Sequence, residues 1–107
     1  SGLNGQSFAF CGYLPAKTDE RRQALKAIEK RSSELHQTQI IIETPYRNDA
    51  LISDLLQYCA PDTRLCIAAD ISLRDEYILT RSIRRWRSEG APVIGKRPCV
   101  FLILASR

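Results

Sequence analysis

The spacing of apolar and polar positions predicts a chain that alternates between strands and helices. Its most informative stretch is Thr38–Arg47, TQIIIETPYR, in which three consecutive β-branched isoleucines are bracketed by polar residues. This pattern favours a strand buried on both faces, in the middle of an α/β sheet. Pro45 lacks the N–H that a first helical turn leaves unpaired, so Glu43-Thr44-Pro45 predicts a strand end followed directly by a helix start.

Four further apolar runs predict strands, and the last of them is the most apolar in the chain. They are Phe8–Leu14, Arg64–Asp70, Glu76–Thr80 and Cys99–Ala105. Sequential strand–helix units imply parallel pairs, whereas the direct connection from Asp70 to Glu76 allows an antiparallel one. We therefore expect a single α/β domain with a five-stranded mixed sheet and helices packed on it.

Three amphipathic segments predict the helices. The first is expected to be capped by Thr18, with an apolar face made of Leu25, Ile28, Ser32 and Leu35. Its other face carries charged residues and is expected to be solvated: Arg21, Arg22, Lys26, Glu29 and Lys30. The second helix should run from about Tyr46 to Cys59, and the third should follow a Ser82 cap and end near Glu89.

The length of 107 residues fits one domain with one core, which we place at residues 8–107. Residues 1–7 are polar and glycine-containing, and together with the absence of a first methionine they suggest a linker from a missing amino-terminal domain. The four cysteines are isolated and mostly lie in apolar runs, as small buried side chains do in a reducing compartment. No apolar run is long enough to predict a membrane span, so we expect a cytoplasmic protein.

The net charge of +4 and the pI near 9.1 suit a protein that meets phosphates, without establishing one. Basic residues crowd the third helix, where Arg81, Arg84, Arg85 and Arg87 surround Trp86. Two interpretations are open. The cluster binds RNA through charge and stacking, or the indole covers an edge of the core while the arginines stay in water.

Most motifs of known chemistry are absent from the sequence. A single histidine excludes a confident His-based triad, no set of metal ligands exists, and no phosphate-binding glycine loop is present. What remains is a group of polar positions at strand ends, namely Gly12–Lys17, Glu43–Arg47 and Asp70. Ligands of open α/β sheets bind beyond the carboxyl ends of strands, so these positions predict a ligand-facing rim; for Asp70, capping the following turn is at least as good an interpretation.

Two spaced motifs resemble those of a known family. The stretch from Phe10 to Lys17, FCGYLPAK, is followed by Glu20-Arg21-Arg22 and Leu25, and then by Glu43-Thr44-Pro45-Tyr46-Arg47. This series is similar to G-[FY]-L-P-x-K, R-x-x-L and E-[ST]-P-[HY]-R in the carboxyl-terminal half of the tetrapyrrole (corrin/porphyrin) methylase family. The closest branch contains the small-subunit ribosomal RNA 2′-O-methyltransferases.

The resemblance implies a function that the composition did not. Members are S-adenosylmethionine-dependent methyltransferases of two α/β domains, usually homodimers, with the cofactor held between the halves. The resemblance therefore implies that this chain is one wall of a cofactor and substrate cleft, inactive without its amino-terminal half. The implied methyl acceptor is RNA, favoured over a tetrapyrrole. The alternative is a non-catalytic module for RNA binding or dimerisation.

Site residues follow from the resemblance position by position. The cofactor-binding positions that it implies lie at two strand ends: Glu43, Thr44, Tyr46, Ala68, Ala69 and Asp70. The positions implied to face substrate or the other domain are Tyr13, Leu14, Pro15, Lys17 and Arg47. No catalytic side chain is implied, because methyl transfer depends on aligning the methyl group with its acceptor more than on a nucleophile.

Overall fold

The computed structural model describes residues 8–15, 17–43, 47–70, 74, 77–90 and 93–105. The described elements follow the order β1 (Phe8–Tyr13), α1 (Thr18–Leu35), β2 (Thr38–Ile42), α2 (Asn48–Tyr58), β3 (Arg64–Ala69), β4 (Tyr77–Ser82), α3 (Ile83–Glu89) and β5 (Cys99–Leu104). Every predicted strand and helix is present, and the predicted single α/β domain with a five-stranded mixed sheet is confirmed.

The sheet has the strand order β1-β2-β5-β3-β4. Of the described strands, only β1 and β2 pair in parallel, while β5 runs antiparallel to both β2 and β3, and β4 antiparallel to β3. The apolar β5 therefore occupies the centre of the sheet. Because β5 separates two strands that each oppose it, β2 and β3 run in the same direction, and their carboxyl ends lie at the same edge of the sheet.

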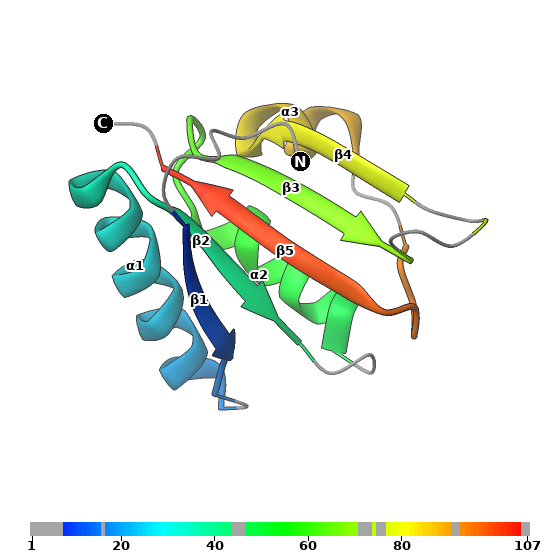
Figure 1. Cartoon of the computed structure of the whole chain (residues 1–107), viewed down its shortest axis with the longest axis horizontal. Coiled ribbons are helices and arrows are strands. Elements are labelled where there is room, and N and C mark those ends of the chain that lie inside the picture. The colour runs from blue at the N-terminus through cyan, green and yellow to red at the C-terminus, as the bar shows by residue number, and fades with distance from the viewer. Residues whose placement is uncertain are drawn as a thin grey trace.

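The helices cover one face of the sheet (Figure 1), with α1 beside β1 and α3 beside β4. The main core lies between this face and the helices, and alternate strand residues such as Ile41, Leu65 and Phe101 are fully buried in it. The opposite face is also apolar. Cys66 and Leu102 lie on it, with the partly buried Ile40 and Val100 packed against them.

Two predictions about helix ends and faces were wrong in detail, and a third falls on residues that the structure does not describe. Thr18 is the first residue of α1 instead of its cap, because the Arg21 amide already bonds the Lys17 carbonyl at 2.8 Å and Lys17 is the extended flanking residue. Leu35 is 59% exposed, since its position in the last turn lies at the margin of the apolar stripe. The second helix begins at Asn48, and the predicted start at Tyr46 lies outside the described residues.

The charged face of α1 differs most from expectation, because Arg21 is buried at 5% exposure instead of solvated. At 100° per residue, positions 21, 25, 28 and 32 share one stripe of the helix, so Arg21 lies directly in line with Leu25, Ile28 and Ser32. Its burial follows from this spacing, and its charge requires partners in the interior.

Candidate cofactor and substrate rim

The carboxyl ends of β2 and β3 form the rim at which the predicted site residues converge. Ile42, Val100 and Ala68 are neighbours in register across three strands, so Glu43 and Asp70 both follow at the same edge. Leu14 follows the parallel strand β1 at this edge. We call this group, Leu14, Glu43, Asp70 and the start of β5, the carboxyl-end rim.

Glu43 is held by a buried ionic group. The Arg21 Nη1 atom lies 2.6 Å from the Glu43 Oε2 atom, and the Arg21 Nε atom lies 3.0 Å from the Asp54 Oδ2 atom. The side chains of Arg21 and Glu43 are only 6% and 1% exposed. Burial alone would lower the pKa of Arg21, and the hydrogen bonds to Glu43 and Asp54 outweigh it, so the pKa is raised above its ordinary value. The guanidinium ties α1, β2 and α2 together at the rim.

Asp70 is fixed differently, by a left-handed backbone and a half-buried partner, Arg97. Its φ of 50° is left-handed, and its amide donates to the Pro98 carbonyl at 2.9 Å. Its carboxylate accepts from the Arg97 Nε atom at 2.5 Å. A left-handed aspartate stabilised by such bonds is typical of sites where the chain direction is set by a ligand or a tight turn. The turn interpretation of Asp70 and the ligand interpretation are compatible here.

The loop before β5 is attached to the first turn of α2. The side-chain amide of Asn48 donates to the carbonyls of Gly95 and Arg97, at 3.1 and 2.7 Å. The Asp49 carboxylate accepts from the amides of Ile94 and Gly95, at 2.8 and 3.0 Å. These bonds place Arg97 beside Asp70, so α2 closes the rim on the side of β5.

Among the residues that the structure describes, two buried polar atoms near this rim have no hydrogen-bond partner, the Arg21 Nη2 and Asn48 Oδ1 atoms. A buried polar group without a partner costs free energy, and native proteins keep few of them. One of the two atoms is a donor and the other an acceptor. The side chains that border the rim therefore retain one unused hydrogen-bond donor and one unused hydrogen-bond acceptor.

The remaining predicted residues divide into buried, exposed and undescribed ones. Ala68 and Ala69 are buried in β3, and Leu14 is buried against the core. Pro15, Lys17 and Arg47 are exposed, and Lys17 flanks the start of α1 while Arg47 flanks the start of α2. Thr44, Tyr46 and the side chain of Tyr13 lie outside the described part of the chain.

Sequence reasoning missed Arg21, Asp54, Asn48 and Arg97 as rim residues. For Arg21 the signal was present, since its spacing from Leu25, Ile28 and Ser32 is that of a buried position. The bonds of Asn48 and Arg97 join segments 27 to 49 residues apart and leave no local pattern.

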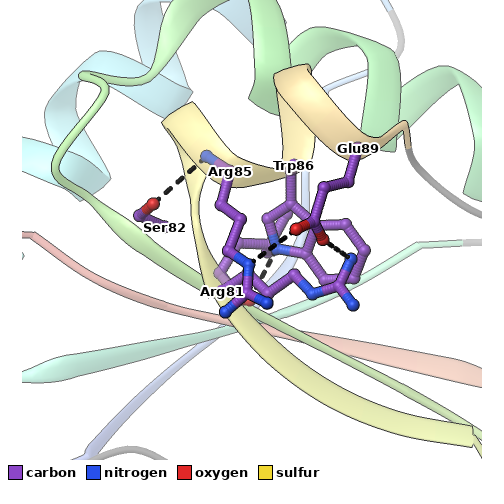
Figure 2. A network of polar contacts seen from close by, with 6 residues as sticks. Arg81, Ser82, Arg85, Trp86 and Glu89 are labelled. Atoms are coloured by element: carbon purple, nitrogen blue, oxygen red, sulfur yellow. Dashed lines mark hydrogen bonds and ion pairs between the residues drawn. The ribbon is translucent and has the colours of Figure 1, made fainter.

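The arginine cluster of α3 lies at the end of β3 opposite the carboxyl-end rim (Figure 2). Trp86, its predicted stacking residue, is not accessible to a ligand. Trp86 is fully buried, and its indole N–H donates to the Leu65 carbonyl at 3.0 Å. The interpretation of Trp86 as an RNA-stacking side chain is therefore wrong, and its interpretation as a core residue is confirmed. Arg81 lies over the indole, with its guanidinium carbon 5.2 Å from the ring centroid.

Within the described residues, no group of three or more His, Cys, Asp or Glu side chains is placed to hold a metal ion. The four cysteines are free thiols. Burial raises the pKa of both Cys59 and Cys99 to about 12, so neither forms a thiolate nucleophile at neutral pH. Of the helices described, none is long and apolar enough for a membrane span.

Comparisons with known proteins identify the class to which the fold corresponds. The methyltransferase CobJ superposes with a TM-score of 0.57 at 13% identity, covering 94% of this chain and 42% of that one. Uroporphyrin-III C-methyltransferase from Thermus thermophilus, solved with S-adenosyl homocysteine, gives 0.54 at 11% identity, covering 94% and 43%. A cobalt precorrin-4 methyltransferase gives 0.52 at 11% identity, covering 92% and 41%. The fold is that of the tetrapyrrole methyltransferases.

Sequence comparison finds similarity to one group of methyltransferases, those that carry the name of ribosomal RNA methyltransferase. The chain is 33% identical over 78 residues to ribosomal RNA small subunit methyltransferase I of Vibrio cholerae, covering 73% of this chain and 26% of the relative. It is 28% identical over 83 residues to the protein of that name in Neisseria meningitidis, covering 78% and 27%. No family model matches the sequence. The resemblance that the motifs indicated is confirmed, and the chain spans about a quarter of the length of these relatives.

Proposed function

We propose that this chain forms one wall of the cofactor and substrate cleft of an S-adenosylmethionine-dependent methyltransferase. The observation that carries the proposal is the carboxyl-end rim, where an acidic residue follows each of two codirectional strands at the same edge of the sheet, near two buried polar atoms that have no partner among the described residues. Ligands of α/β sheets bind at such an edge. The names of the sequence relatives, and the S-adenosyl homocysteine bound to one structural neighbour, support the choice of ligand.

The chemistry of the rim fits this cofactor. S-adenosylmethionine carries ribose hydroxyls and an ammonium group that donate hydrogen bonds, and a carboxylate that accepts them. The Asp70 carboxylate is 12% exposed and can accept hydrogen bonds, and it follows the buried Ala68 and Ala69 at the end of β3. Glu43 is nearly inaccessible, so its proposed contribution is to hold the Glu43–Arg47 junction in place through Arg21.

The cofactor supplies an activated methyl group, and the rim supplies alignment. Methyl transfer needs the acceptor atom in line with the methyl group and at contact distance, which fixed side chains provide without forming a covalent intermediate. The tie from Arg21 to Glu43 and the tie from Arg97 to Asp70 hold the two strand ends rigidly. The proposed roles of Thr44, Tyr46, Tyr13, Pro15, Lys17 and Arg47 remain those implied by the resemblance.

RNA is the acceptor that we propose over a tetrapyrrole. The sequence relatives are named as ribosomal RNA methyltransferases, whereas the tetrapyrrole enzymes share only the fold at 11–13% identity. A cytoplasmic location agrees with an RNA substrate and forms part of the proposal.

The proposal includes an amino-terminal domain as partner, because the relatives are about four times as long as the matched segment. The sheet face without helices exposes apolar side chains, among them Phe10 at 67% and Ile78 at 44%. Contiguous apolar surface of this kind marks a contact face. We assign it to that domain, and light scattering of the chain alone tests whether a second copy covers it instead.

Calorimetric titration tests whether the protein binds the proposed cofactor. S-adenosylmethionine and S-adenosyl homocysteine are titrated into the chain alone, and into the chain joined to the amino-terminal half of the Vibrio cholerae relative. We expect binding to the joined protein only. No binding to either, with both folded by circular dichroism, would overturn the methyltransferase proposal.

Variants of the joined protein test whether Asp70 of the rim contributes to cofactor binding. Asp70→Asn should weaken cofactor binding several-fold, because a neutral amide accepts hydrogen bonds more weakly than a carboxylate. Asp62→Asn is the matched control, since Asp62 lies in an exposed ion pair away from the rim. Equal affinities in the two variants would remove Asp70 from the site.

A further inference from the structure

A hollow with a volume of about 520 Å³ lies at the end of the sheet opposite the carboxyl-end rim. Its lining comes from the start of β3, the end of β4 and the first turn of α3. We call it the arginine hollow, and it is lined by Asp62, Arg64, Thr80, Arg81, Ser82 and Arg85. The register explains how it forms, since Arg64 pairs with Ser82 and the adjacent Leu65 with Arg81.

Two of its arginines are held in place by one acid. The Glu89 carboxylate lies 2.5 Å from the Arg81 Nη1 atom and 2.9 Å from the Arg85 Nε atom, as Figure 2 shows. Arg81 also lies over the buried indole of Trp86. Each guanidinium carries five N–H donors, so both retain donors after these bonds. The two side chains are therefore oriented before any ligand arrives.

The third arginine is free. Arg64 is exposed and makes no ion pair or side-chain hydrogen bond with any residue of the described chain. Thr80 and Ser82 also line the hollow, and the Ser82 hydroxyl accepts from the Arg85 amide at 3.2 Å. Counting Arg84, which pairs with Asp62 at 3.1 Å, four arginines face two carboxylates, Asp62 and Glu89. The hollow therefore keeps a net positive charge.

Oriented guanidinium groups match the oxygens of a phosphate group, because their N–H donors can bond two oxygens at once. Arg64 in the hollow and Asp70 at the rim are six residues apart along β3, a distance of about 20 Å at about 3.3 Å per residue. A small cofactor bound at the rim does not reach that far, whereas a polymer with a phosphate at every unit does. The distance favours a polyanion.

We propose that the arginine hollow binds backbone phosphates of the RNA substrate while the methylated nucleotide lies at the rim. The proposal rests on RNA being the acceptor in the proposed function. It differs from an interaction through the whole α3 cluster, because Trp86 is buried and Arg87 donates to the carbonyls of Leu56 and Cys59. The contacts are made by Arg64, Arg81 and Arg85.

The test is fluorescence anisotropy of a labelled 20-nucleotide single-stranded RNA with the 107-residue chain over a range of salt concentrations. The test variant is Arg64→Gln/Arg85→Gln. The control is Lys26→Gln/Arg31→Gln, which removes the same two charges from exposed positions of α1. Circular dichroism establishes that each variant is folded.

We expect the hollow variant to bind RNA at least tenfold more weakly at low salt. The slope of log affinity against log salt should become shallower by about 1.4, since each phosphate contact on a single strand contributes about 0.7. The control should bind within about twofold of the unaltered chain. Equal loss in both variants, or no RNA binding by the unaltered chain, would overturn the hollow as the site.

Inorganic phosphate, titrated at constant ionic strength, separates a polymer from a single anion. Displacement of the RNA only at high millimolar phosphate is expected, and displacement at micromolar phosphate would mean that the hollow is a site for a small anion. Cofactor binding by the joined protein does not depend on the hollow. A failure of this proposal is therefore distinguishable from a failure of the methyltransferase proposal.

Discussion

Arginine serves two different purposes at the two ends of this sheet. At the carboxyl-end rim, Arg21 is buried and shared between Glu43 and Asp54. At the arginine hollow, Arg85 is 61% exposed in its ion pair, and Arg64 makes no ion pair with any of the described residues. Burial decides the difference. An ion pair out of water cannot lose one partner without leaving a stranded charge, whereas an exposed guanidinium is hydrated and remains available to an incoming anion.

The largest effect should come from removing the buried cation. Arg21→Met leaves the buried Glu43 carboxylate without the Arg21 guanidinium, and we expect a loss of about 3–5 kcal/mol in the free energy of unfolding. Arg84→Met is the matched control, because the Arg84–Asp62 pair is 70% and 66% exposed and such pairs contribute about 0–1 kcal/mol. Urea denaturation of both variants makes the measurement.

A second variant separates charge from packing. Arg21→Met/Glu43→Gln should be more stable than Arg21→Met alone, since the neutral amide has no stranded charge. If Arg21→Met costs no more than Arg84→Met, the buried ion pair does not support the rim.

The elements of the fold were predictable because their signals are local. Three adjacent isoleucines, the polar residues around them and the helical spacing of Leu25 and Ile28 all act within a few residues. The contacts of the rim are not local. Arg21 meets Glu43 and Asp54 at separations of 22 and 33 residues, so the family motifs pointed to the rim while its internal bonds appeared only in three dimensions.

Trp86, beside the arginine hollow, shows the same limit of prediction from sequence. Its sequence neighbours are arginines, which left stacking on RNA and packing in the core equally open. The carbonyl that accepts its N–H belongs to Leu65, 21 residues away, and that bond decides in favour of the core.

An intermediate effect is expected for Trp86→Phe. The benzene ring keeps an apolar group in the core but leaves the Leu65 carbonyl without its indole donor, which should lower the free energy of unfolding by about 1–3 kcal/mol. RNA affinity should stay within about twofold, because the indole faces the core. Denaturation and anisotropy measure the two quantities on one sample. A large fall in RNA affinity with intact folding would mean that RNA binding depends on the indole, through Arg81 that lies over it, and that the two ends differ less than we propose.

The smallest expected effect is a shift in the pKa of Glu89, the carboxylate that pairs with Arg81 and Arg85 of the arginine hollow. The hydrogen bond from Arg85 lowers the pKa of Glu89; burial opposes this shift, and the charges of Arg81 and Arg85 add to it. A carboxyl with a lowered pKa in the folded state stabilises the fold above its unfolded-state pKa. That contribution disappears as the pH falls through the folded-state value.

Arg85→Gln should therefore move the pKa of Glu89 upward, as measured by nuclear magnetic resonance of its carboxyl carbon during an acid titration. Arg84→Gln should leave it unchanged, because Arg84 pairs with Asp62. An unaltered titration of Glu89 in Arg85→Gln would mean that the two guanidinium groups are not held by this acid in solution, and the hollow would lose the orientation on which phosphate binding depends.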